Sequence, residues 1–166
     1  MSVTLVELTV SLFIRHTAKP WVLPAVRKAE KLIANDDSLN HEYLPILGME
    51  DFSNLATRML LGDDSPAIKE GRVISAQSLS GTGALRVIAD FLRLCCKANT
   101  VYISAPSWPN HQLLFKHAHY TSINTYRYWN SATKSLDFAG MLEDLEKAPK
   151  GAVVVLHTVA HNPTVR

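Results

Sequence analysis

The sequence has little cysteine, little excess charge of either sign and no long uninterrupted apolar run. Its two cysteines, Cys95 and Cys96, are adjacent, so they match neither a metal site nor a disulfide framework, and they indicate a reducing compartment. Lys plus Arg number 17 against 15 Asp plus Glu. A chain with so little excess charge lacks the basic surface typical of proteins that bind nucleic acid or anionic membranes. No repeat or linker divides the chain.

What is present is a globular composition. The chain has 166 residues, of which 47% are hydrophobic, and this content excludes a disordered chain. The length is that of one domain, for which about 100–200 residues are expected. Residues 1–14 are mostly apolar but include Glu7. The segment is too short to span a bilayer and lacks the basic start of a secretory signal. We expect residues 1–18 to form a separate N-terminal arm with strand-like alternation.

Two amphipathic helices are expected in the first half of the chain. Apolar residues at helical spacing predict one from Val22 or Leu23 to about Ala34, with Pro24 in its first turn. A second is predicted over 49–61, ending before a polar turn that begins at Gly62. We expect this second helix to bury the apolar side chains Phe52, Leu55, Met59 and Leu60.

Strands and helices alternate in the second half. The pattern predicts strands at 73–79, 101–104, 122–128 and 152–159, and helices at 83–97, 110–119 and 138–147. The last strand is an apolar β-branched run typical of buried parallel strands. This order predicts an α/β fold, a partial three-layer sandwich around a mostly parallel sheet.

A possible anion site follows the first of these strands. Ser80-Gly81-Thr82-Gly83 stands directly before a helix. Glycines allow close backbone approach, hydroxyls donate, and the free N–H groups and dipole of a helix start favour an anion. An ordinary N-cap is an equally good interpretation. The loop lacks the Gly-Lys-Ser/Thr of a Walker motif and the third glycine of a dinucleotide fingerprint.

Two further polar loops follow later strands. Pro106 to His111 contains Trp108, which can stack on a flat ring, although a tryptophan folded over the edge of the core is the alternative. His161-Asn162-Pro163-Thr164 follows the last strand, where Asn162 can donate a hydrogen bond, although these residues can also be a simple turn. Ligands of open α/β sheets bind beyond the carboxyl ends of the strands. An anion cradle, an aromatic platform and an amide there suit a planar aromatic phosphate, and pyridoxal phosphate fits.

Several long segments, in order, resemble one family. They are Pro20-Trp21-Val22-Leu23-Pro24, residues 38–48 (SLNHEYLPILG), residues 79–86 (LSGTGALR), Tyr126-Arg127-Tyr128, Leu136-Asp137-Phe138, and Ala160-His161-Asn162-Pro163-Thr164. From about Lys19 to Thr164 the chain resembles the fold type I aspartate aminotransferases, and most of all the cytosolic type. The resemblance implies that residues 19–166 are the N-terminal part of the class I/II aminotransferase domain: the arm, the start of the small domain and the first half of the large domain.

The resemblance also implies site residues, a cofactor and partners. Ser80, Gly81 and Thr82 match the loop that binds the phosphate of pyridoxal 5′-phosphate. Trp108 matches the residue that stacks on its ring, Asn162 the residue that bonds its phenolic oxygen, and both match positions that hold the substrate α-carboxylate. His111 matches a histidine that supports the aspartate below the pyridine nitrogen. Tyr43 matches the tyrosine that reaches the phosphate in the neighbouring subunit, which implies a homodimer. From its residues alone, the stretch from Tyr43 to Ile46 is typical of a buried segment.

The chain also departs from the family pattern. None of its nine lysines occupies the Schiff-base motif, so no catalytic residue is assigned. Pro109 stands where glycine is usual, Val165 follows Thr164 where the motif continues with glycine, and residues 11–17 do not match the substrate loop before Pro20. The chain is therefore expected to be a truncated or misjoined product that is inactive alone.

Three functional hypotheses stay open. The first is a cytoplasmic aspartate aminotransferase, which exchanges an amino group between L-aspartate and 2-oxoglutarate, represented here by its N-terminal portion. The second is a non-catalytic product that dimerises with the full-length enzyme or interferes with it. The third is a module that binds phosphate or pyridoxal phosphate without a covalent bond. No metal, nucleic acid or membrane partner is expected.

Overall fold

The computed structural model describes residues 21–165 of the 166. They form two compact units, residues 21–77 and residues 78–165. The expected arm at residues 1–18 lies outside the described residues. None of the described helices has the length and apolarity needed to cross a membrane.

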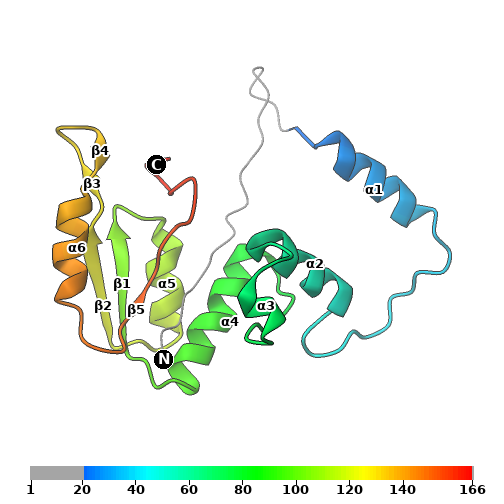
Figure 1. Cartoon of the computed structure of the whole chain (residues 1–166), viewed down its shortest axis with the longest axis horizontal. Helices are drawn as coiled ribbons and strands as arrows, with labels where there is room; N and C mark the ends of the chain where they lie inside the picture. The colour runs from blue at the N-terminus through cyan, green and yellow to red at the C-terminus, as the bar shows by residue number, and fades with distance from the viewer. Residues whose placement is uncertain (1–20, 166) are drawn as a thin grey trace. The chain divides into compact units, whose positions relative to one another are not determined.

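A parallel sheet of three strands organises residues 78–165 (Figure 1). Its central strand is β1 (Thr100–Ala105), flanked by β2 (Ser122–Arg127) and β5 (Val153–Val154). β1 pairs with β2 over its full length, from Thr100↔Ser122 to Ala105↔Arg127. β5 pairs with β1 only at Val101↔Val153 and Tyr102↔Val154.

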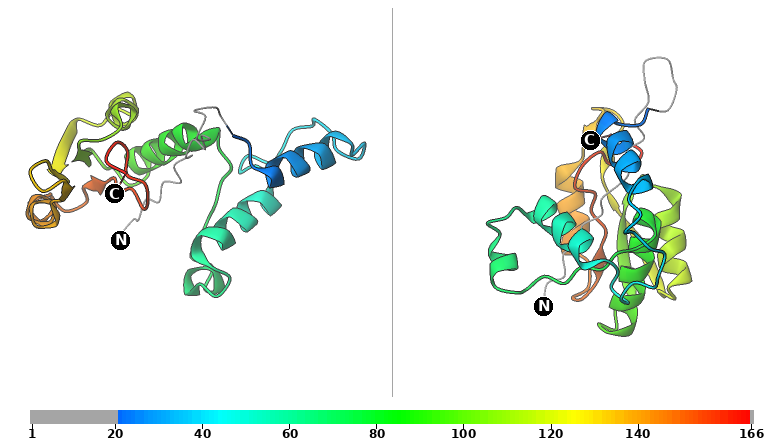
Figure 2. Two further views of the ribbon diagram at one scale, coloured as in Figure 1. Left: turned by 90° about the horizontal axis from the view of Figure 1, so that it is seen from above. Right: turned by 90° about the vertical axis from the view of Figure 1, so that its right-hand side faces the viewer.

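Helices cover both faces of this sheet. α4 (Ser80–Leu94) and α5 (Pro109–His117) lie on one side of the sheet, and α6 (Phe138–Glu146) lies on the other (Figures 1 and 2). A short antiparallel hairpin, β3 (Trp129–Asn130) and β4 (Ser135–Leu136), precedes α6. The expected α/β fold with a parallel sheet between helical layers is confirmed.

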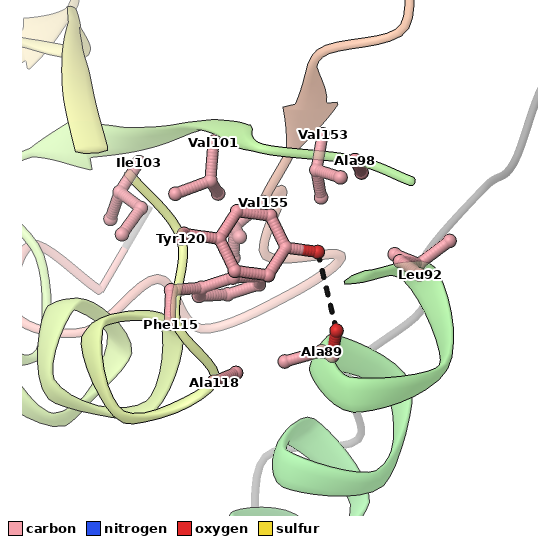
Figure 3. Packing of buried hydrophobic residues seen from close by; sticks show 10 residues of the cluster. All are labelled: Ala89, Leu92, Ala98, Val101, Ile103, Phe115, Ala118, Tyr120, Val153 and Val155. Atoms are coloured by element: carbon pink, nitrogen blue, oxygen red, sulfur yellow. Dashed lines mark hydrogen bonds between the residues drawn. The ribbon is translucent and has the colours of Figure 1, made fainter. Parts of the chain in front are cut away.

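The core of this unit lies between the sheet and α4 with α5 (Figure 3). Val101, Ile103 and Phe115 are fully buried there, since alternate residues of β1 face the same side. Tyr120 packs edge-on against Phe115 with ring centroids 4.9 Å apart, and its hydroxyl donates to the Ala89 carbonyl at 3.3 Å. This packing fixes α4 and α5 against the strands whose ends carry the candidate site.

Residues 21–77 form a helical unit. It contains α1 (Pro24–Ala34), α2 (Glu50–Leu61) and the single turn α3 (Pro66–Lys69). α1 begins with a proline at its first position, where the missing N–H costs nothing. α2 ends at Gly62, whose φ of +82° suits glycine. The expectations for α1 and for the bounds of α2 are confirmed.

The expected burial on α2 is wrong. Its apolar side chains face outward within the unit, with Phe52 52%, Leu55 65% and Met59 76% exposed, and Leu60 is also exposed. The polar face of the helix is the one that packs. Ser53 is buried, and Thr57 Oγ1 lies 2.5 Å from Ser75 Oγ. The apolar face therefore has no cover within residues 21–77.

Two strand predictions also need correction. Residues 73–79 form no strand with any of the described residues, since a strand needs a neighbour for its hydrogen bonds. The predicted strand 152–159 pairs with β1 only at Val153–Val154, and His157 makes an isolated bridge. Val155 N–H still donates to the Tyr102 carbonyl at 2.9 Å, after which the chain leaves β1. The segment from Tyr43 to Ile46 is exposed rather than buried.

Candidate functional site

The candidate site lies at the carboxyl ends of the parallel strands. Loops leave β1 after Ala105, β2 after Arg127 and β5 after Val154, and parallel strands bring such loops to one edge. Figure 1 shows α4 running back beside the sheet, so that its first turn lies at the end toward which the β1 arrow points. The three predicted loops thus belong to one end of this unit.

The first turn of α4 offers open hydrogen-bond donors. The helix begins at Ser80, three residues before the predicted start, so Ser80, Gly81 and Thr82 belong to its first turn rather than to a loop before it. Among residues 21–165 no side chain caps this end, and Ser80 and Thr82 are exposed. Ser80 has a φ of +59°, a left-handed conformation uncommon outside glycine. An uncapped helix start with two hydroxyls fits a phosphate group.

Trp108 and His111 meet at the start of α5. Trp108 is the N-cap residue of this helix and is half-buried. The edge of one ring faces the other, with centroids 5.4 Å apart. His111 is buried, and its Nδ1 lies 2.8 Å from Ser107 Oγ. The fixed imidazole supports the partly open indole.

Two more histidines connect this pair to the last loop. The His111 ring meets His157 edge-on at 4.9 Å, and His157 stacks on His161 at 4.3 Å. His157 Nδ1 accepts a hydrogen bond from the backbone N–H of Asn162 at 3.1 Å. A continuous row of rings therefore runs from Trp108 to the residue beside Asn162.

His161 is buried with both ring nitrogens bonded. Its Nε2 lies 2.8 Å from Ser104 Oγ and its Nδ1 lies 2.9 Å from Thr164 Oγ1. Burial, and to a smaller extent the nearby His157 and His111, lower the pKa of His161 to about 4. The imidazole is therefore neutral at neutral pH.

Tyr126 supports the same region from β2. It is buried, and its hydroxyl donates to the Val155 carbonyl at 2.7 Å. Burial raises the pKa of this phenol to about 12, so it stays protonated and keeps the bond. This contact ties β2 to the segment that follows β5.

The structure brings most of the predicted site residues into one unit. Trp108 and His111 belong to the row of rings, Asn162 bonds to it through its backbone N–H, and Ser80 to Thr82 form the start of α4. Tyr43 lies in the unit 21–77, where its side chain is fully exposed. No group of three or more His, Cys, Asp or Glu side chains suited to a metal occurs in residues 21–165.

Sequence reasoning gave no role to Ser104, Tyr128, His157 or His161. A signal was present: His157 interrupts an apolar β-branched run, and His161 follows four residues later. Two histidines in a segment otherwise expected to be buried must find hydrogen-bond partners there.

Comparison with known protein families gives one match. The model of the family "Aminotransferase class I and II" matches residues 4–165. Among curated proteins, the chain is 52% identical over 164 residues to the cytoplasmic aspartate aminotransferase of Gallus gallus, covering 96% of this chain and 40% of that protein. It is 50% identical over 159 residues to the Caenorhabditis elegans enzyme of the same name, covering 96% and 39%. The chain thus spans about 40% of the length of these relatives.

Solved structures agree. The aspartate aminotransferase from Saccharomyces cerevisiae cytoplasm matches with a TM-score of 0.86 and 46% identity, covering 95% of this chain and 38% of that one. An aromatic-amino-acid aminotransferase from Burkholderia pseudomallei, covalently bound to pyridoxal phosphate, matches with a TM-score of 0.86 and 43% identity, covering 93% and 38%.

Proposed function

Since the chain belongs to the class I and II aminotransferase family, we propose that it is the cofactor-binding N-terminal part of a cytoplasmic aspartate aminotransferase. The reaction would exchange an amino group between L-aspartate and 2-oxoglutarate, giving oxaloacetate and L-glutamate. The observation that carries this proposal is the row of rings from Trp108 to His161, next to Asn162, in the unit that also holds the open start of α4. Homology to cytoplasmic enzymes supports the substrates and the compartment.

The residues of this site fit pyridoxal phosphate. When bound, the cofactor supplies an electron sink that makes the α-proton of an amino acid acidic. In our proposal Ser80, Gly81 and Thr82 hold the phosphate through the uncapped helix start, whose partial charge of about +0.5 favours an anion. Trp108 stacks on the ring, where the indole is half-buried and steadied by His111.

Asn162 and His111 complete the proposed roles in this unit. The Asn162 amide donates to the phenolic oxygen, and with Trp108 it orients the substrate α-carboxylate. His111 supports the aspartate below the pyridine nitrogen.

Partner and domain assignments follow the same resemblance. We propose that Tyr43, fully exposed here, reaches the cofactor phosphate of a neighbouring subunit in a homodimer. Residues 1–18 would be the arm and residues 19–166 the start of the catalytic domain. Because no lysine matches the Schiff-base motif, we propose that this chain alone does not turn over substrate.

A fluorescence titration tests the cofactor site. Pyridoxal 5′-phosphate added to the chain should quench the emission of Trp108. Trp108→Phe should remove most of this quenching, whereas Trp129→Phe, in the β3–β4 hairpin, should keep it. Thr82→Val should raise Kd by about 10- to 150-fold, since hydrogen bonds to charged groups are worth about 1.5–3 kcal/mol. Unchanged emission of the wild-type chain would contradict the proposal.

Borohydride separates reversible binding from covalent attachment. After treatment with cofactor and borohydride, a chain that holds the cofactor through hydrogen bonds and stacking should lose it on gel filtration. A stoichiometric pyridoxyl label on one particular lysine would instead show that the chain carries its own attachment residue. Measurable transaminase activity of the 166-residue chain would overturn the proposed inactivity.

A second candidate function is supported by the apolar face of α2. Phe52, Leu55 and Met59 are exposed within their unit, and a face of this kind typically contacts another chain or segment. The chain would then dimerise with the full-length enzyme and lower its activity. Co-expression should yield mixed dimers, and Leu55→Lys with Met59→Lys should abolish them. Failure to recover any mixed dimer would remove this candidate.

A further inference from the structure

His161 is contacted at both ring nitrogens and on both faces of its ring. One nitrogen contacts Ser104 at the end of β1 and the other contacts Thr164 three residues further along the chain. One face stacks on Tyr128 with ring centroids 3.8 Å apart and the other on His157 at 4.3 Å. The ring is buried, so rotation about its side-chain bonds would break several contacts at once.

These contacts continue into the backbone of Asn162. This residue directly follows His161, and its N–H donates to His157 Nδ1 at 3.1 Å. The turn closes behind it where Val165 N–H donates to the His161 carbonyl at 2.6 Å. Asn162 itself is exposed, so its backbone is fixed from below while its side chain stays accessible.

We propose that His161 is a positioning residue: by joining the end of β1 to the turn at 161–165, it fixes the orientation of the side-chain amide of Asn162. The inference builds on the proposed function, in which that amide meets the cofactor. Preorganised donors contribute most when residues beneath them hold them still.

An imidazole is well suited to this place. A neutral ring has one N–H and one lone pair on opposite sides, and hydroxyls such as those of Ser104 and Thr164 can donate or accept. Either tautomer therefore satisfies both bonds. The low pKa of His161 keeps the ring in this neutral state. A phenylalanine would keep the stacking on Tyr128 but lose both hydrogen bonds.

Amide hydrogen exchange tests the inference without cofactor. In His161→Phe the backbone N–H of Asn162 should exchange about tenfold faster, which is the equivalent of one lost net hydrogen bond. The exchange rate of the Ile103 backbone N–H in β1 should not change. Thr164→Val and Ser104→Ala should each give a smaller acceleration. His161→Gln, which keeps an amide able to reach one hydroxyl, should recover part of the protection. His117→Phe, at an exposed histidine of α5, is the matched control.

Cofactor titration provides the second measurement. Kd for pyridoxal 5′-phosphate should rise by about tenfold in His161→Phe and stay unchanged in His117→Phe. A folded His161→Phe chain with wild-type exchange at Asn162 would overturn the inference. If that variant does not fold, unchanged exchange at Asn162 in Thr164→Val and Ser104→Ala would overturn it equally. Absence of binding to the wild-type chain would instead refute the proposed function and leave the exchange result to decide the positioning role.

Discussion

The imidazole of His161 lies nearly parallel to the phenol ring of Tyr128, with ring planes 14° apart and centroids 3.8 Å apart. Tyr128 directly follows β2, whereas His161 follows β5, so this contact joins the outer two strands of the sheet beyond their carboxyl ends. Stacking of this kind excludes water from the imidazole, and this makes the stability of the folded chain depend on pH.

Stability should fall as the pH drops below about 6.5. The pKa of His161 is lowered from 6.5 to about 4, by burial first and then by His157 and His111. Between these values the unfolded chain binds a proton that the folded chain does not, so the free energy of unfolding rises with pH across this window and levels off above it. The shift corresponds to on the order of 3 kcal/mol. Urea unfolding from about pH 4 to 7 measures it, and His161→Gln should flatten the dependence.

Removing the Tyr126 hydroxyl should destabilise the residue 78–165 unit. Tyr126→Phe deprives the buried Val155 carbonyl of a donor at 2.7 Å, at an expected cost of about 1–2 kcal/mol in the free energy of unfolding. Tyr102→Phe, at a half-buried position of β1, should cost less. Equal effects of the two substitutions in urea unfolding would show that the hydrogen bond contributes nothing particular.

The start of α6 should show coupling between Asp137 and Gly140. The Asp137 carboxylate accepts from the Gly140 N–H at 3.0 Å, and a Cβ at position 140 would collide with that carboxylate. Asp137→Ala should cost about 1 kcal/mol through loss of the cap. Gly140→Ala should bring no gain in the wild type but up to about 1 kcal/mol in the Asp137→Ala background, where helix propensity acts alone. A double-mutant cycle with additive effects would contradict the coupling.

Both cysteines should react as free thiols in the folded chain. Cys95 and Cys96 are free and exposed. Adjacent Cα atoms are about 3.8 Å apart across a trans peptide, closer than the roughly 4.4–6.8 Å usual for a disulfide. Titration with a chromogenic disulfide reagent should therefore release two equivalents without denaturant, and Cys95→Ser should release one. A single slow equivalent from the wild type would indicate that one thiol is covered.

Local pattern predicted the elements whose signals lie within the element itself. Pro24 marked the start of α1, and the alternation of strands and helices from residue 101 to 147 predicted β1, α5, β2 and α6 nearly at their observed bounds. The polar loops of the candidate site after β1 and β5 could also be predicted, because strand ends and turn residues are both visible in sequence. The hairpin of β3 and β4, with strands of two residues each, is too short for any periodic signal.

The predictions that failed concern contacts between residues that are distant in the chain. Residues 73–79 have a strand-like composition, but the described chain supplies no strand beside them. Leu55 has the spacing of a core residue, yet its unit packs the opposite face of α2. The sequence indicates that His157 and His161 need hydrogen-bond partners, but the spacing of His111 and His161 along the chain gives no hint that both rings contact His157.

The strand order β2-β1-β5 also has a kinetic consequence. Val101 pairs with Ile123, 22 residues along the chain, and with Val153, 52 residues along. Closing the longer loop costs about 0.8 kcal/mol more chain entropy and is repaid by only two residue pairs. The β1–α5–β2 unit should therefore form early, and β5 should pair with β1 late. Because His157 and His161 follow β5, the contacts that hold the backbone of Asn162 would form in the last step of folding.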